Sequence, residues 1–263
     1  LRPTVLFTYP SAAVVLAEEA HSGRLRARPA EIRTGGETLT PAMRRYVADA
    51  FGCPVGNEYG CSEFPPLATE CRLGALHLNA DWAILESVDV RGRPVAEGTR
   101  GARCLLTNLA NHVQPLIRYE LEDSVAIHPA RCACGSPLPV IDVAGRIDDV
   151  LRIGTGSEAA PALSPMALTT VLEEEAGLVD FQLLQVGPRR LELRCRHHAA
   201  HDLLALRRGR DALVDYLRAQ QAGSVDVAAR PDRPPVLEPS GKFKRVRGLA
   251  AAGSPRGRGR DGA

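Results

Sequence analysis

Short apolar stretches alternate with longer amphipathic ones at the start of the chain. The alternation predicts strands at 5–8, 31–34 and 54–59 and helices at 12–21 and 42–51. Ser11 and Thr40 stand at the expected helix starts, as N-capping residues do. Gly23 and Gly52 follow the expected helix ends. Strands that alternate with helices through short glycine turns predict a partly parallel sheet covered by helices, the pattern of an α/β domain.

Closely spaced strands replace this alternation between residues 75 and 143. They are expected at 83–88, 103–108, 116–119 and 125–128. No helix-length segment separates them. The sequence therefore predicts a small β-barrel or β-sandwich as the last section of a first domain, residues 1–145.

Helical periodicity returns after residue 145. Strands are expected at 150–153, 181–186, 191–196 and 225–229 and helices at 165–176 and 200–220. These elements predict a compact α+β domain over 146–248, and the glycine-containing junction before it is a natural hinge. Residues 249–263, with arginines among glycines, predict a disordered basic tail.

Composition narrows the class of protein. Hydrophobic residues make up 44% and charged residues 24% of the 263 residues, a mix that excludes disordered, collagen-like and coiled-coil chains. No run reaches the roughly 18 apolar residues that a membrane span needs. A formal net charge of +2 creates no dominant field. Neither a membrane nor nucleic acid is therefore an expected partner.

Two residue counts are unusual. The 33 basic residues include two lysines, Lys242 and Lys244, so the compact ammonium of Lys242 differs from almost every other cation of the chain. The seven cysteines are an odd number and no signal peptide precedes them, which favours a reducing cytoplasm over a secreted disulfide framework. The chain begins at Leu1 within domain-like sequence, and we expect it to be a fragment.

Candidate ligand-binding residues stand where the expected strands end. The pair Gly35-Gly36, followed by Glu37, allows a flat ligand to approach the backbone, although such pairs are more often simple turns. The next strand leads into Tyr59-Gly60-Cys61-Ser62-Glu63. This run places an aromatic ring, a hydroxyl and a carboxylate at the carboxyl edge of the sheet, where open α/β sheets bind ligands. A turn with a half-buried tyrosine is the simpler alternative.

Three later segments add charged groups. Asp123 follows the run Pro-Leu-Ile-Arg-Tyr and suits a ribose diol, unless it only caps a loop. Arg146 and Asp148 belong to Gly-Arg-Ile-Asp-Asp at the expected hinge. Lys242 ends Pro-Ser-Gly-Lys near the end of the chain.

In this order, the five segments resemble the AMP-forming ligases, the superfamily of acyl-CoA synthetases and adenylation enzymes, and most closely its phenylacetate-coenzyme A ligase branch. The resemblance covers most of residues 1–248, but only about the second half of such an enzyme. It implies the C-terminal part of a large adenylate-forming domain, followed by a small mobile lid domain.

The resemblance gives the first two segments a role in nucleotide binding. Gly35, Gly36 and Glu37 would flank the adenine of ATP or AMP. Tyr59 would stack on the adenine, and Ser62 would contact a phosphate.

The remaining residues would act on the ribose, the metal and the reaction. Asp123 and Arg146 would hold the ribose, and Glu63 would bind Mg²⁺. Asp148 would be the pivot of the lid domain, and Lys242 would be the mobile catalytic lysine that bridges the attacking carboxylate and the α-phosphate.

The implied activity has two steps. A carboxylic acid, most commonly an aryl acid, attacks ATP to give an acyl-adenylate and pyrophosphate, and a thiol, expected to be coenzyme A, then displaces AMP. One family feature is absent from the printed sequence, because nothing before Thr34 matches the Ser/Thr/Gly-rich phosphate loop that ends in a lysine. We therefore expect the chain alone to be inactive.

Four soft ligands form a second constellation. Cys132 and Cys134 are one residue apart before a glycine, and Cys71 and His77 lie beside the expected β-region. Four such ligands suit one structural Zn²⁺, although the spacing of the cysteine pair is tighter than usual and buried or free thiols remain the alternative. Similar Cys-x-Cys-Gly elements occur in the phenylacetate ligase branch.

Two other classes of function stay open. The chain could be a non-catalytic remnant that binds AMP, or a zinc-stabilised interaction module whose basic tail contacts nucleic acid. The chain could also form a homodimer.

Overall fold

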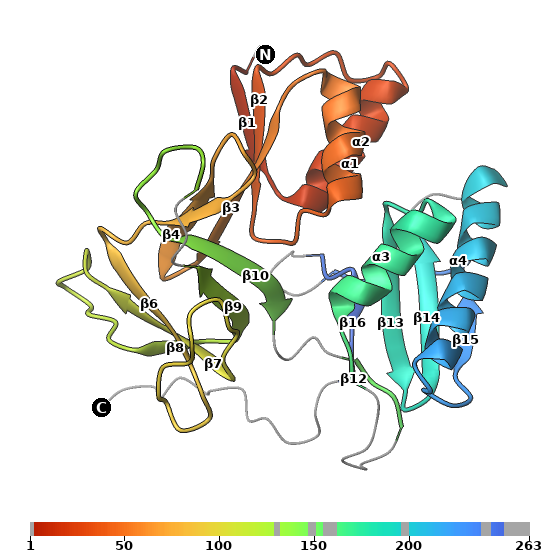
Figure 1. Ribbon diagram of the computed structural model, residues 1–263. Helices are drawn as coiled ribbons and strands as arrows, with labels where there is room; N and C mark the ends of the chain where they lie inside the picture. Colours follow the sequence, from red (N-terminus) through yellow and green to blue (C-terminus); the bar gives the residue numbers. More distant parts are fainter. Residues whose placement is uncertain are drawn as a thin grey trace, which may run out of the picture.

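A sheet of seven strands forms the frame of the residues before 147, as Figure 1 shows. The computed structural model describes residues 3–128, 132–146, 151–154, 162–195, 200–237 and 243–249. In the order of the sheet, the strands are β1 (Val5–Thr8), β2 (Glu31–Gly35), β3 (Val55–Cys61), β4 (Phe64–Glu70), β5 (Leu76–Leu78), β10 (Val140–Arg146) and β9 (Asp123–His128). β1, β2 and β3 are parallel, and the other neighbours are antiparallel. The predicted α/β class and the partly parallel sheet are confirmed.

Two helices, α1 (Pro10–His21) and α2 (Pro41–Phe51), cover one face of the parallel strands. Their apolar side chains pack with those of the strands into a buried core around Ile32 and Val47. Thr40 caps α2 as predicted, because its hydroxyl accepts a hydrogen bond from the Met43 amide at 3.1 Å. The prediction of Ser11 as a cap is wrong: α1 starts at Pro10, and Tyr9 occupies the capping position without a side-chain bond.

The β-rich region consists of two packed sheets. A three-stranded sheet is formed by β6 (Ala83–Val88), β7 (Arg103–Asn108) and β8 (Tyr119–Leu121). It shares one buried core with β4, β5, β9 and β10 of the larger sheet, through residues such as Leu67, Leu106 and Ile141. Within the described residues these strands form an open two-sheet arrangement, which corresponds to the sandwich rather than to a closed barrel. We call the described residues up to 146 the large part.

The described residues from 151 to 249 are called the small part. Its elements are β11 (Leu151–Arg152), β12 (Ala162–Leu163), α3 (Pro165–Ala176), β13 (Phe181–Gly187), β14 (Arg190–Cys195), α4 (Ala200–Ala219), β15 (Asp226–Ala229) and β16 (Val246–Arg247). A four-stranded sheet in the order β15-β14-β13-β16 packs against α3 and α4 (Figure 1). Its core is separate from the two cores of the large part. The expected hinge at Asp148 and nearly all of the tail lie outside the described residues.

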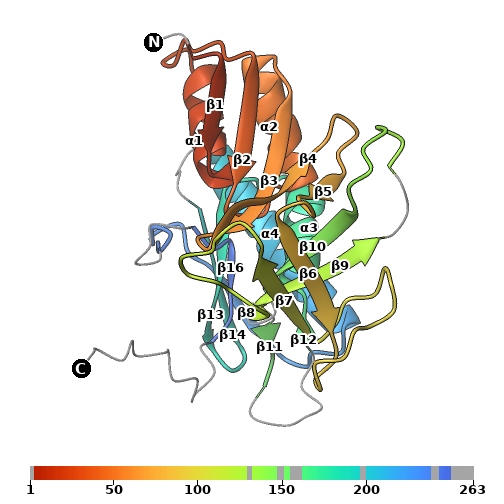
Figure 2. The ribbon, with the colours of Figure 1, turned by 90° about the vertical axis from the view of Figure 1, so that its left-hand side faces the viewer.

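The second face of the parallel strands has no helix over it among the described residues, as Figure 2 shows. β1 is also the last strand of its sheet. Its side chains Val5 and Phe7 are 50% and 61% exposed. An apolar edge strand of this kind is a surface to which another polypeptide can bind.

No helix of the described residues is both long and apolar enough to cross a membrane.

Candidate functional site

The glycine pair closes the carboxyl end of β2. Gly35 lies opposite Glu58 of β3, and a Cβ at Gly35 would come 3.1 Å from the Glu58 carbonyl oxygen. Gly36 has φ +79°, and a Cβ there would come 2.8 Å from the Tyr9 ring. Both positions therefore depend on glycine, one for a close approach of backbone and the other for a left-handed conformation. Of the two glycines, Gly36 is exposed and Gly35 is buried.

Tyr59 and Asp123 meet across the larger sheet, beside the strand position of Arg146. The Tyr59 hydroxyl donates a hydrogen bond to Asp123 Oδ2 at 2.8 Å. Asp123 on β9 lies opposite Arg146 on β10 in the strand register. Burial, followed by the charge of Asp123 and the hydrogen bond to it, raises the pKa of Tyr59 far above its usual value. The Tyr59 hydroxyl therefore stays protonated, and the hydrogen bond that it donates holds the Asp123 carboxylate in place.

Ser62 and Glu63 form the exposed turn between β3 and β4. The Tyr119 hydroxyl donates to Glu63 Oε1 at 3.0 Å, and this hydrogen bond to the carboxylate raises the pKa of Tyr119. The bond connects the turn to β8 of the smaller sheet. Sequence reasoning assigned no role to Tyr119, because nothing local to it shows that β8 ends beside this turn.

Glu37 makes two contacts that the sequence did not predict. One carboxylate oxygen accepts a hydrogen bond from the Ser11 amide at 3.0 Å, in the first turn of α1. The other oxygen accepts from the Phe243 amide at 3.1 Å. Phe243 follows Lys242 in the chain, and Lys242 itself lies outside the described residues. The structure thus brings the segment after the predicted catalytic lysine to the predicted adenine-binding turn.

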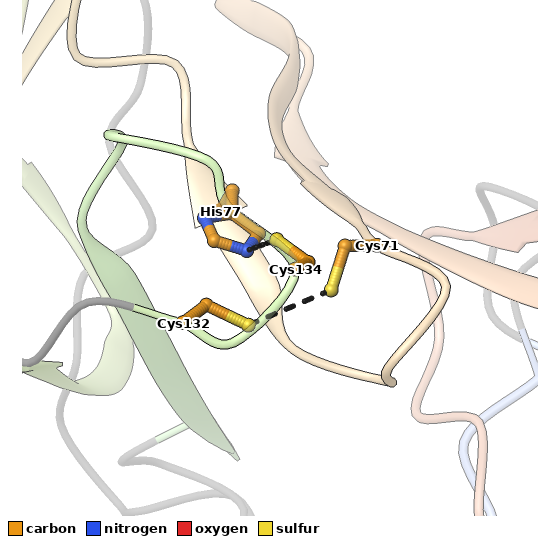
Figure 3. Close-up of side chains that lie close together, drawn as sticks. All are labelled: Cys71, His77, Cys132 and Cys134. Carbon is orange, nitrogen blue, oxygen red and sulfur yellow. Dashed lines mark hydrogen bonds between the residues drawn. The ribbon is translucent and has the colours of Figure 1, made fainter.

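The four predicted zinc ligands come together, His77 from β5 and the three cysteines from two neighbouring turns, as Figure 3 shows. The ligand atoms of Cys71, His77, Cys132 and Cys134 all lie within 4.8 Å of one another. Cys71 Sγ is 3.9 Å from Cys132 Sγ, and Cys134 Sγ is 3.3 Å from His77 Nε2. Antiparallel pairing of β5 with β10, with His77 opposite Val140, holds the two turns side by side.

Backbone groups orient this cluster. The Leu138 carbonyl oxygen lies 3.0 Å from His77 Nδ1, so it accepts the Nδ1 proton and leaves Nε2 as the ligand atom. Burial acts to raise the pKa of Cys71. Hydrogen bonds from the Leu73 amide and from neighbouring backbone and side-chain groups outweigh burial and lower this pKa to about 6. A thiolate is therefore accessible near neutral pH.

The donor set fits zinc. Tetrahedral Zn²⁺ with Zn–S bonds of about 2.3 Å places two sulfur ligands about 3.8 Å apart. The separation of Cys71 and Cys132, 3.9 Å, is close to that value. Three thiols and an imidazole are also the ligand types that structural zinc sites use.

The other cysteines lie in apolar surroundings. Cys104 and Cys195 are buried, and Cys53 is half-buried against the core under α1 and α2. Burial is the largest influence on the pKa of Cys104 and raises it to about 12. Cys104 is therefore a neutral core residue at physiological pH.

No family model matches the chain. In sequence, it is 33% identical over 162 residues to the phenylacetate-coenzyme A ligase of Thermus thermophilus, a match that covers 58% of this chain and 36% of that protein. It is also 33% identical over 99 residues to protein CapK of Staphylococcus aureus, covering 38% of this chain and 20% of CapK. The chain thus spans about a third or less of the length of these curated relatives.

Among solved structures, the chain is similar to a 2-hydroxyisobutyryl-CoA ligase in the postadenylation state. The TM-score is 0.72 at 21% identity, over 93% of this chain and 54% of that chain. The same ligase in the thioesterification state gives a TM-score of 0.51 at 20% identity over the same shares of both chains. The large and small parts are therefore arranged more as in the postadenylation structure.

The fold is that of part of an acyl-adenylate-forming CoA ligase, and the resemblance to that class is confirmed. Within the class, the sequence is similar to the phenylacetate-coenzyme A ligase branch, over a portion of such a protein.

Proposed function

We propose that this chain takes part in the ATP-dependent activation of a carboxylic acid and its transfer to coenzyme A. The observation that carries the proposal is the hydrogen bond between Tyr59 and Asp123, which joins strands β3 and β9. Arg146 stands opposite Asp123 in the strand register, and Gly35 lies opposite Glu58, the neighbour of Tyr59. A core-packing role alone does not require the polar groups of Tyr59 and Asp123 to meet. The similarity to a phenylacetate-coenzyme A ligase favours an aryl acid as the substrate.

The nucleotide would lie along the carboxyl ends of β2 and β3. Gly35 and Gly36 offer backbone next to the adenine, on which Tyr59 would stack. The Asp123 carboxylate, which Tyr59 holds in place, would accept hydrogen bonds from the ribose hydroxyls, with Arg146 beside it.

The first step joins a carboxylate oxygen to the α-phosphorus and breaks the bond from that phosphorus to pyrophosphate. Charge on the phosphates must be neutralised, and positioning contributes more than covalent help from the protein. Lys242 would bring its ammonium to the meeting point of carboxylate and α-phosphate, and the Ser62 hydroxyl would donate to a phosphate oxygen. Glu63, an exposed carboxylate, fits a magnesium ligand, and Mg²⁺ bound there would neutralise phosphate charge.

The second step forms a carbon–sulfur bond and breaks the acyl–phosphate bond. The thiol loses its proton to solvent, and AMP leaves. We propose that the small part turns about Asp148 between the two steps and gives the thiol access to the acyl group. The difference between the two TM-scores of one ligase in two states supports such a rotation.

We further propose that the Cys71, His77, Cys132 and Cys134 cluster holds one structural Zn²⁺. All four coordination positions would be filled by protein, so no position remains for a substrate. The ion would join the turn before β5 to the turn before β10.

Binding of a non-hydrolysable acyl-adenylate, phenylacetyl sulfamoyl adenosine, tests the nucleotide site on this chain. Isothermal calorimetry of the unchanged chain should detect binding, and Asp123→Asn should weaken it by about 10- to 100-fold, because a hydrogen bond to a charged group is lost. Asp142→Asn is the matched control, since Asp142 lies on β10 and pairs with Arg100 at the surface. Equal affinities of the two variants would contradict the assignment of Asp123.

ATP–pyrophosphate exchange with a panel of aryl and aliphatic acids tests the reaction and the substrate class. Exchange that depends on an aryl acid supports the proposal. Binding of the analogue without exchange, in a form of the protein that contains the phosphate loop, would favour the non-catalytic AMP-binding alternative.

A further inference from the structure

Two carboxylates lie at the contact between the large and small parts. Glu37 of the large part accepts hydrogen bonds from the Ser11 amide at 3.0 Å and from the Phe243 amide at 3.1 Å. One of its oxygens therefore faces α1 and the other faces the small part. A carboxylate with both oxygens engaged by backbone amides is held in one orientation.

Glu173 of α3 makes the second contact. It accepts a hydrogen bond from the Thr40 hydroxyl at 2.7 Å and forms an ion pair with Arg245 at 2.6 Å. The Thr40 hydroxyl also accepts from the Met43 amide, so its single proton is available for Glu173. The residue that caps α2 is thus also an attachment point for the small part.

Arg245 is held mainly by groups of the small part, and its guanidinium also lies 3.6 Å from the Met43 sulfur of the large part. Its guanidinium donates to the Val179 carbonyl oxygen at 2.9 Å and lies 4.1 Å from the centre of the Phe181 ring. The side chains of Arg245 and Glu173 are only 10% and 6% exposed. A buried ion pair with additional hydrogen bonds on both partners has a defined geometry, and removal of either partner leaves an uncompensated charge. Glu173 is therefore presented to Thr40 in a fixed position.

We infer that Glu37 is a positioning residue for the segment after Lys242, and that the bond between Thr40 and Glu173 is a second attachment which holds the small part in the same arrangement. The inference rests on the proposed function for its role in the reaction. Both contacts join the two parts, so both must break when the small part turns about the hinge. Both contacts are made between groups of the protein, and together they select the arrangement in which Phe243 lies at the glycine turn.

Amide hydrogen exchange on the 263-residue chain tests this inference without nucleotide or turnover. The Phe243 amide reports the contact between the parts, because it donates to Glu37. The Leu183 amide reports the small part by itself, because it donates to the Arg245 carbonyl oxygen at 2.7 Å, next to β16. Exchange at both amides is measured by nuclear magnetic resonance.

Glu37→Gln should accelerate exchange of the Phe243 amide by about tenfold or more and leave the Leu183 amide unchanged, since it removes a charged acceptor from the contact alone. Glu173→Gln should also accelerate exchange of the Phe243 amide, through the second contact, but it leaves the charge of Arg245 unpaired and so should affect the Leu183 amide as well. Glu175→Gln is the matched control, because Glu175 is an exposed residue of the same helix. It should change neither amide.

Unchanged Phe243 exchange in Glu37→Gln would overturn the inference. Equal acceleration at Phe243 and Leu183 in Glu37→Gln would also overturn it, since Glu37 would then act on the folding of the small part. If Glu173→Gln does not fold, because it leaves Arg245 unpaired, Glu37→Gln still decides the matter. A failure of ligase activity would leave these exchange rates untouched, so the two proposals can fail separately.

Discussion

Two candidate sites of the larger sheet are assembled in different ways. We call the Cys/His cluster the closed site, and the proposed nucleotide site around Gly36, Tyr59 and Asp123 the open site. The cluster takes His77 from β5 and its three cysteines from the turns before β5 and β10, and its ligand atoms already lie within 4.8 Å of one another. The residues of the open site come from the ends of β2 and β3, the start of β9, the end of β10 and a segment of the small part. One site is complete within a single part, whereas the other is complete only when two parts meet.

This difference agrees with the roles that we propose for the two sites. A structural metal site needs a closed shell of ligands and no movement. A site for a two-step reaction needs an opening for substrates and a part that can leave between the steps. The engaged carboxylates Glu37 and Glu173 lie between the two parts, where the movement that we propose would begin.

We expect the largest effect from a substitution in the closed site, the Cys/His cluster, on bound zinc and on the stability of the fold. Cys134→Ser should reduce bound zinc from about one equivalent to none and should lower the free energy of unfolding by several kcal/mol, because metal binding and folding are coupled. Metal analysis and urea unfolding of the purified chain measure both quantities. Cys53→Ser is the matched control and should retain the metal, since Cys53 packs against the helices. A chain that is folded and stable without metal would contradict the prediction.

On the open site, Lys242→Ala should have the next largest effect. Loss of a charge that stabilises the transition state should slow adenylate formation by about a thousandfold, while transfer from supplied adenylate to coenzyme A should stay nearly unchanged. Lys242→Arg should not restore the rate, because a planar guanidinium cannot occupy the place of a compact ammonium.

ATP–pyrophosphate exchange and thioester formation measure the two steps separately, in a form of the protein that turns over. Lys244→Ala is the control at the other lysine of the chain. Equal loss of both steps in Lys242→Ala would show misfolding in place of a role in adenylation.

The sequence predicted local elements and rare residue types well, and contacts between distant segments poorly. The periodicity of residues 5–59 predicted the parallel strands and helices, because each element buries its own apolar face. The four zinc ligands were predicted as one set because their residue types are rare and serve few purposes. β4 was not predicted, since its Pro-Pro sequence is unusual for a strand and only the tight turn after Cys61 pairs it with β3.

Contacts between distant residues could not be predicted from the chain. Glu37 and Phe243 are far apart in sequence and have no local pattern in common. The same holds for Thr40 and Glu173, which only the packing of α3 against the large part brings together. Tyr59 and Asp123 were both predicted as nucleotide ligands, but their mutual hydrogen bond depends on the sheet order and not on either motif.

We expect a smaller effect from a substitution on the uncovered face of β1, which should change how strongly the chain self-associates. The exposed apolar side chains of β1 predict that the chain self-associates, because burial of such a side chain contributes roughly 1.5–3 kcal/mol. Phe7→Thr should weaken self-association by about tenfold in analytical ultracentrifugation. Val113→Thr is the control, since Val113 is 97% exposed in a loop of the other sheet. Similar association of both variants would show that β1 is not the contact.

The smallest expected effect tests the rigidity of the open site. Tyr59→Phe removes the hydroxyl that donates to Asp123 and keeps the ring, so affinity for the acyl-adenylate analogue should fall only a few-fold, in keeping with a net hydrogen-bond contribution of about 0.5–1.5 kcal/mol. Because burial and the adjacent carboxylate raise the pKa of Tyr59, its hydroxyl stays protonated and the affinity of the unchanged chain should show no loss near pH 10 from ionisation of this tyrosine. Calorimetry of both proteins at pH 7.5 and pH 10 measures this. A ratio of affinities between the two proteins that moves towards one at pH 10 would show that Tyr59 ionises, and that the carboxylate is held less firmly than the geometry indicates.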